Sequence, residues 1–196
     1  PGKPTNPTSA TFPAKYDTVD SAKLFKTSGI VMENDMQQRL LSYFQQAGAD
    51  IRNASLIFEG YGKGIEAFHA ACDDRRNLLV LIQLKQGGVY GGFTQNGWGK
   101  TNQFGNRKSF LLNSSYDKIA KFNGRSNYPT QLDPKHGPDF GLQQLGVDRL
   151  NKGYCKKVVM PGDPFDFPDL FFFPRPEQSD TTVFEIATYE VWQIVL

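Results

Sequence analysis

Residues 78–84 (LLVLIQL) are apolar on both faces of any strand they form, and this limits the folds open to the chain more than any other segment. The run is too short to span a membrane and is typical of a central strand covered on both sides. Gly87 and Gly88 follow it, and residues 89–95 form a second apolar segment. Glycine supplies the positive φ that a tight hairpin turn needs. We therefore expect an antiparallel hairpin at the centre of the protein.

Two segments have the spacing of amphipathic helices. In residues 34–47 the apolar positions recur with a period near 3.6, with Asn34 as the expected N-cap and Gly48 just past the C-terminal end. Residues 65–73 are predicted to form a shorter helix that places Phe68 and Cys72 on one face. Neither helix carries a charge cluster, so we expect both to cover a core.

The remaining apolar segments alternate as strands do. They are residues 55–59, 109–113, 116–122, 145–150, 154–160 and 182–196. The chain has 16 Phe, 8 Tyr, 19 Gly and 12 Pro, which suits half-buried strands separated by turns. Because the connections are local, antiparallel pairing is favoured. We predict an α+β, mainly β fold, an antiparallel β-sandwich with flanking helices.

With 196 residues, the chain has the length of one domain. Residues 1–22 are rich in Pro, Thr and Ser and are expected to form an irregular or disordered leader, followed by a single domain over residues 23–196. Residues 162–178 combine Phe with Pro, so we expect a long loop pinned by buried Phe side chains.

The charge pattern disfavours two classes of partner. The net charge is +2, and the basic residues are interspersed with acidic ones, so nucleic-acid binding is not expected. The sequence has no apolar run approaching about 20 residues, so membrane insertion is not expected either. The two cysteines favour a reduced, cytoplasmic protein over a disulfide-bonded one.

Candidate chemistry centres on the predicted helix at residues 65–73. The glycine turn before it, residues 60–64, has neither the Walker pattern nor the dinucleotide-binding spacing, so it indicates a strand-to-helix turn. His69 and Cys72 are half of a zinc site, but structural zinc needs four ligands, usually in two close pairs. A nucleophilic Cys72 assisted by His69 is the catalytic alternative, and a core histidine with a buried thiol is the structural one. We expect no cofactor.

Two loops are candidates for binding. Asp163, Asp166 and Asp169 offer carboxylates for Ca²⁺, but without the EF-hand spacing. The loop at residues 95–108 carries aromatic and basic side chains of the kind that anchor protein interfaces. Its candidate binding residues are Trp98, Lys100, Phe104, Arg107 and Lys108. The alternative is a solvated hairpin with Trp98 folded back on the core.

Several motifs in order resemble a TLDc domain, the module of oxidation-resistance proteins. Residues 68–73 (FHAACD) match the family's F-H-x-x-C-D, residues 89–94 (VYGGFT) match V-F-G-G-Y-T, and residues 137–141 (GPDFG) resemble G-P-x-F-G. Residues 184–194 resemble its final strand, and the resemblance extends from about residue 25 to the end.

The resemblance implies a non-enzymatic, intracellular protein-interaction domain with a role in protection against oxidative stress. Its first candidate partner is the V-type proton ATPase, and a cytoskeletal or ciliary assembly is the next. The resemblance also implies recruitment to organelle membranes or to the cytoskeleton through the partner. A thiol-based antioxidant enzyme that uses Cys72 is the rival function.

Overall fold

A computed structural model describes residues 24–98, 107–124, 130, 135–141, 144–148, 152–156, 164–165 and 181–196. The predicted leader lies outside these residues, as does most of the Phe- and Pro-rich segment at residues 162–178. Within the latter, only Pro164 and Phe165 are described, and Phe165 is fully buried.

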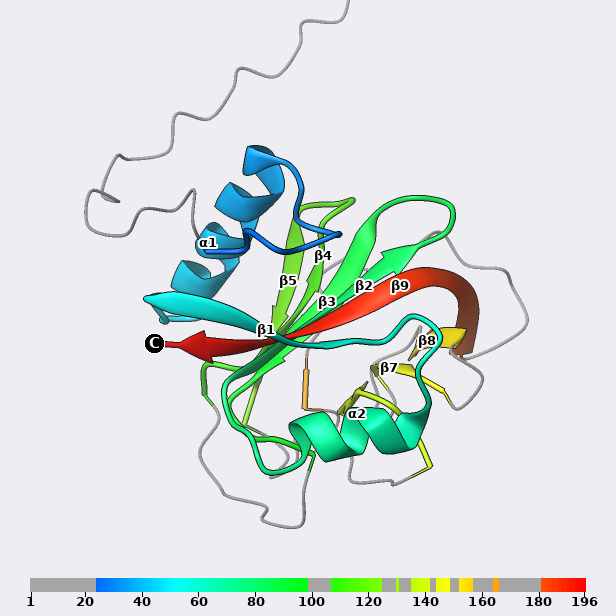
Figure 1. Ribbon diagram of the computed structural model, residues 1–196. Helices are drawn as coiled ribbons and strands as arrows, with labels where there is room; N and C mark the ends of the chain where they lie inside the picture. Colours follow the sequence, from blue (N-terminus) through cyan, green and yellow to red (C-terminus); the bar gives the residue numbers. More distant parts are fainter. Residues whose placement is uncertain are drawn as a thin grey trace, which may run out of the picture.

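Two helices and nine strands are described (Figure 1). In chain order they are α1 (Asn34–Gln46), β1 (Asn53–Glu59), α2 (Ile65–Cys72), β2 (Leu78–Leu84), β3 (Val89–Thr94), β4 (Phe110–Asn113), β5 (Lys118–Lys121), β6 (Asp139–Phe140), β7 (Leu145–Val147), β8 (Lys152–Lys156) and β9 (Thr181–Val195). Neither described helix is long and apolar enough to cross a membrane.

The predicted central hairpin is confirmed. Strands β2 and β3 pair antiparallel, and the turn glycines Gly87 and Gly88 have φ of 95° and 85°. All strands pair antiparallel in the order β5-β4-β3-β2-β9-β8-β7-β6, and β1 also pairs with β9. The α+β, mainly β class is therefore confirmed, whereas this single path of pairing does not show the expected sandwich of two sheets.

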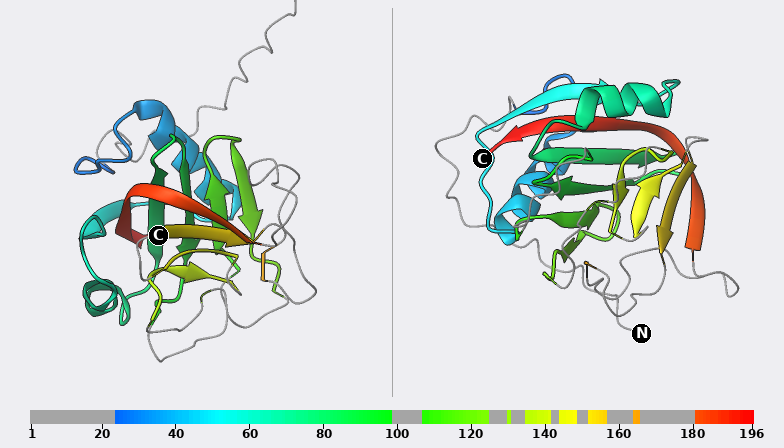
Figure 2. Two further views of the ribbon diagram at one scale, coloured as in Figure 1. Left: turned by 90° about the vertical axis from the view of Figure 1, so that its right-hand side faces the viewer. Right: turned by 90° about the horizontal axis from the view of Figure 1, so that it is seen from below.

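The central sheet separates two hydrophobic cores. On one face, α1 packs Leu40 and Phe44 against the side chains of β2, β3 and β4 that point that way, such as Phe93. On the other face, α2 and the short strands β6, β7 and β8 cover Val80 and Ile82 (Figure 2). The both-sided apolar pattern of residues 78–84 follows from this arrangement, since five of the seven β2 side chains have no exposed surface.

Strand β9 links the two parts of the sheet. Its N-terminal part pairs with β8 and its C-terminal part pairs with β2 and β1, with a visible bend between them (Figure 1). The register with β2 shifts between Gln83 and Leu84, which adds one residue to β9 at Ala187. Before this bulge Ile186 faces the α2 core, and after it Tyr189 faces the same core. The bulge thus keeps one face of a bent strand buried.

A strap formed by residues 24–31 crosses the α1 side of the sheet. Its apolar side chains are buried, and the ring of Phe25 contacts that of Trp192 with 5.0 Å between centroids. Glu190, only 2% exposed, holds the strap. Its carboxylate accepts hydrogen bonds from Ser28 Oγ at 2.6 Å, Gly29 N at 2.7 Å and Trp192 Nε1 at 2.9 Å. These three donors satisfy a carboxylate that would otherwise be costly to bury.

Two local predictions need correction. Residues 139–140, which are not among the predicted strands, form β6, because they pair with two residues of β7, and so short a strand leaves no periodic signal in the sequence. The N-cap of α1 is Glu33 rather than Asn34, and no side chain caps the helix. Gly48 has φ of 73°, as predicted for the residue after the helix.

Candidate functional site

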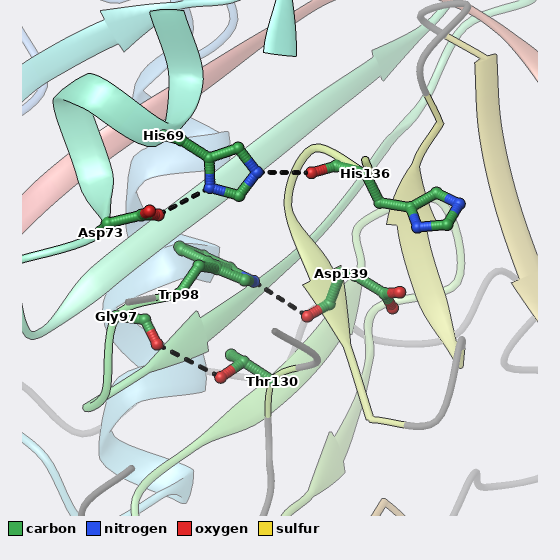
Figure 3. Close-up of polar contacts among 7 residues, drawn as sticks. All are labelled: His69, Asp73, Gly97, Trp98, Thr130, His136 and Asp139. Carbon is green, nitrogen blue, oxygen red and sulfur yellow. Dashed lines mark hydrogen bonds and ion pairs between the residues drawn. The ribbon is translucent and has the colours of Figure 1, made fainter. Parts of the chain in front are cut away.

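The residues of the family-like motifs meet at one seam, shown in Figure 3. We call it the α2 seam. On one side lie α2 and the end of the β3 segment, and on the other lie Thr130 and the segment at residues 135–141. Side-chain hydrogen bonds of His69, Trp98 and Thr130 cross it, and they join parts of the chain that lie 33 to 67 residues apart.

His69 makes the first of these bonds. Its Nε2 lies 3.0 Å from the carbonyl oxygen of His136, and its Nδ1 lies 2.8 Å from Asp73 Oδ1. Because a carbonyl oxygen can only accept, Nε2 is the donor there. Asp73 follows four residues later as the C-cap of α2, and its helical backbone conformation brings its carboxylate beside the ring. His69 therefore joins α2 to the segment at residues 135–141.

Trp98 makes the second bond. Its side chain is 3% exposed, and its Nε1 donates to the carbonyl oxygen of Asp139 at 2.9 Å. The indole lies between the rings of Phe68 and Phe140, at centroid distances of 5.3 and 5.5 Å. Of the two alternatives for Trp98, the structure shows the one in which the side chain folds back on the core.

Gly97 allows the chain to pass close to the end of α2. A Cβ at this position would lie 2.3 Å from the carbonyl oxygen of Arg75 and 2.7 Å from that of Asp73, closer than real Cβ atoms come. Its own carbonyl oxygen accepts the third seam bond, from Thr130 Oγ1 at 3.3 Å. Any larger residue here would push the β3 segment away from α2.

Gly92 likewise allows close packing in the middle of β3. A Cβ there would lie 2.8 Å from the ring of Phe140 and 2.9 Å from Leu111 Cδ2. Its neighbour Gly91 has the backbone oxygen of Val80 only 2.2 Å from the Cβ position. Gly91 therefore allows a close backbone approach to β2, and Gly92 leaves room for the Phe of G-P-D-F-G against the V-Y-G-G-F-T segment.

Cys72 sits on the buried side of α2 and is 0% exposed. Burial, together with the neighbouring Asp73, raises the pKa of its thiol to about 12. A nucleophilic cysteine needs an accessible, electropositive setting that favours the thiolate. The environment of Cys72 is the opposite, and it supports the structural interpretation of the His69 and Cys72 pair.

The glycine turn at residues 60–64 leads β1 into α2, as the sequence indicates. Gly64 is the N-cap of α2, and Gly62 has φ of 68°. A Cβ on Gly60 would overlap the ring of Tyr189, which lies directly beneath the turn. The turn is therefore shaped by packing against β9.

No metal site is found among the residues that the structure describes, where no group of three or more His, Cys, Asp or Glu side chains converges. Asp163, Asp166 and Asp169 lie outside those residues. The calcium hypothesis for this loop stays a prediction.

Two of the predicted binding residues lie at the base of the loop at residues 95–108. Arg107 is exposed and Lys108 is half-buried, and the Lys108 amide donates to Gln95 Oε1 at 3.3 Å. Strand pairing places Lys121 opposite Phe110, so its exposed side chain belongs to the same end of the β4–β5 hairpin. Lys100 and Phe104 lie outside the described residues.

We call Arg107, Lys108 and Lys121 the basic end of this hairpin. Sequence reasoning missed Lys121 because its proximity depends on the register of β5 against β4. The register is set by burial of Ala120 and Leu111 on one face, which a four-residue strand signals too weakly to align by sequence alone.

A family model described as the TLDc domain matches residues 25–195. The chain belongs to the TLDc family. No significant match to a curated protein accompanies this result. In this TLDc domain, the F-H-x-x-C-D motif supplies two core side chains, Phe68 and Cys72, and one hydrogen-bonded pair, His69 and Asp73.

Proposed function

We propose that this TLDc domain is a non-enzymatic docking module that binds an acidic surface of a larger assembly through the basic end of the β4–β5 hairpin. The observation that carries the proposal is a contrast in burial between the core residues of the α2 seam and the basic residues beside the predicted binding loop. Phe68, Cys72 and Trp98 are buried and engaged in packing, whereas Arg107 and Lys121 are exposed beside the predicted binding loop. Exposed Arg is a frequent anchor at protein interfaces.

The V-type proton ATPase is the first candidate partner, on the strength of the family resemblance. In this proposal the domain is cytoplasmic and reaches organelle membranes through the pump. Protection against oxidative stress then follows from binding, because the two cysteines are 0% and 2% exposed and neither is placed for thiol chemistry. A cytoskeletal or ciliary assembly is the second candidate.

A titration of purified V-type ATPase with labelled domain tests the proposal. Saturable binding that weakens as salt is added is expected, because charge complementarity between exposed groups is screened by ions. Binding to microtubules under the same conditions serves as the comparison. Absence of saturable binding to the pump at micromolar concentration would remove the first candidate, and preferential binding to microtubules would favour the second.

A further inference from the structure

His69 faces a hydrogen-bond acceptor at each ring nitrogen. The carbonyl oxygen of His136 lies 3.0 Å from Nε2, and Asp73 Oδ1 lies 2.8 Å from Nδ1. A neutral imidazole carries one proton, so it can donate to only one of these two acceptors. The carboxylate is the stronger acceptor, so the neutral ring donates through Nδ1, and the Nε2 lone pair then faces the carbonyl oxygen of His136, which is repulsive.

The ring can donate to both acceptors only if it carries a second proton. Imidazole is the more basic of the two groups, so the ring holds it and becomes imidazolium. The side chains of His69 and Asp73 are 15% and 33% exposed, so the pair is shielded but open to proton exchange with solvent. Both contacts are satisfied together only in the protonated state.

The two contacts join different parts of the molecule. Asp73 orients the ring on α2, while Nε2 reaches the backbone at residue 136. The same segment anchors Trp98 through the Asp139 carbonyl, and it is tied to β7 by Gly137 N donating to Val147 O at 2.9 Å. We propose that His69 is a protonation-dependent latch that holds α2 against the segment at residues 135–141, closed at acidic pH and loosened as the pH rises.

Other ionisable groups near the ring do not replace His69 as the sensor. On α2 they are Glu66, Cys72 and Asp73, on the facing segment Lys135, His136 and Asp139, and on β9 Tyr189. Burial raises the pKa of Tyr189 and brings that of Cys72 to about 12, so both stay neutral at physiological pH. His136 contributes its backbone carbonyl to the contact, and its ring points away from His69 (Figure 3).

The chain has two indole groups, and they report on different places. Trp98 Nε1–H is bonded across the α2 seam, whereas Trp192 Nε1–H is bonded to Glu190 on the opposite face of the sheet. Hydrogen exchange of both indoles, followed by NMR in one sample between about pH 5.5 and 8, separates the seam from the rest of the fold.

After correction for intrinsic exchange, protection of the Trp98 indole is expected to fall about tenfold across this range, the effect of losing one charge-assisted hydrogen bond. Protection of the Trp192 indole is expected to stay constant. Parallel loss at both indoles would overturn the proposal, because it would indicate a change in global stability. A constant Trp98 value would overturn it as well.

Three variants assign the effect to His69. The neutral His69→Gln and the amide Asp73→Asn, which can donate to an unprotonated Nδ1, are each expected to remove the pH dependence at Trp98. His136→Gln keeps the carbonyl and is expected to retain it. The latch is contradicted if His136→Gln abolishes the dependence, or if the two other variants leave it intact. All measurements use the domain alone, so a failure of the latch is distinct from a failure of docking.

Trp98 belongs to the predicted binding loop at residues 95–108 and makes one of the hydrogen bonds of the seam. A closed latch therefore fixes one base of that loop, and docking should be tighter at acidic pH. This consequence rests on the proposed function.

Discussion

Replacing Glu190 by Gln tests the physical account of the strap. The carboxylate accepts three hydrogen bonds, from Ser28 and Trp192 at Oε2 and from Gly29 at Oε1. Ser28 Oγ already accepts from the amides of Ile30 and Val31, so its proton is committed to Glu190. A glutamine has one accepting oxygen, and its NH₂ group must face at least one of the three donors.

The best glutamine rotamer keeps its oxygen at the Oε2 position and turns its NH₂ toward Gly29 N–H. One hydrogen bond to a charged group is lost, at about 1.5–3 kcal/mol, and the remaining two lose their charge assistance. We expect the free energy of unfolding to fall by about 3 kcal/mol, with Tm lower by about 6–12 °C for a domain of this size.

Urea unfolding followed by tryptophan fluorescence measures the change. Glu185→Gln is the matched control, because this carboxylate lies on the same strand but is 57% exposed and, among the described residues, forms ion pairs with Lys85 and Lys152, at 3.3 and 3.7 Å. Its loss should cost less than about 0.5 kcal/mol. Equal costs at the two positions, or a Glu190→Gln cost below about 1 kcal/mol, would refute the reasoning.

Three further predictions concern the core and α1. The pKa of Cys72 is raised to about 12 in the folded protein, so as the pH rises the thiol of the unfolded chain loses its proton first. The free energy of unfolding should therefore fall by about 1.4 kcal/mol per pH unit above about pH 9. Urea titrations of Cys72→Ala at the same pH values should lack this contribution. Gly92→Ala should destabilise by about 1–3 kcal/mol in the same assay, since its Cβ meets Phe140 at 2.8 Å, and an unchanged midpoint would contradict the packing. Tyr43→Phe removes the 2.8 Å bond from the Tyr43 hydroxyl to Asp117 and should cost about 0.5–1.5 kcal/mol by thermal unfolding, with a neutral or stabilising result arguing against that contact.

Local sequence patterns predicted the parts of the fold that depend on residues close together in the chain. The period near 3.6 predicts α1, and the apolar run with its glycine turn predicts the β2–β3 hairpin, since a few residues determine each. Even the close approach at Gly91 follows from a glycine placed where a strand should have a side chain.

Long-range features left no such signal. In the sequence of β9, nothing distinguishes Glu190 from an exposed glutamate. Its burial depends on the contact with Ser28, which lies 162 residues earlier in the chain. The bulge at Ala187 changes which side chains face the core, but the sequence of β9 alternates on both sides of it. Tertiary contacts decide both features, and single-sequence patterns do not contain them.

The same distinction between local and long-range contacts applies to the candidate site. The position of Cys72 on the apolar face of α2 follows from helical spacing, and its burial is confirmed. The burial of Trp98 could not be predicted from the surrounding glycines and basic residues, because its hydrogen-bond partner, Asp139, lies 41 residues away in the sequence. The hydrogen bonds of His69 depend equally on that distant segment, so its connecting role was not predicted.

The most direct test of the docking proposal compares two double charge reversals of equal net charge. Arg107→Glu with Lys108→Glu alters the basic end of the β4–β5 hairpin, while Lys26→Glu with Lys63→Glu alters exposed lysines on the strap and the glycine turn. Dissociation constants from V-type ATPase are measured for both, after equal Tm values establish that both are folded. The account predicts at least about tenfold weaker binding for the first pair and wild-type binding for the second. Equal binding by the two variants would contradict it.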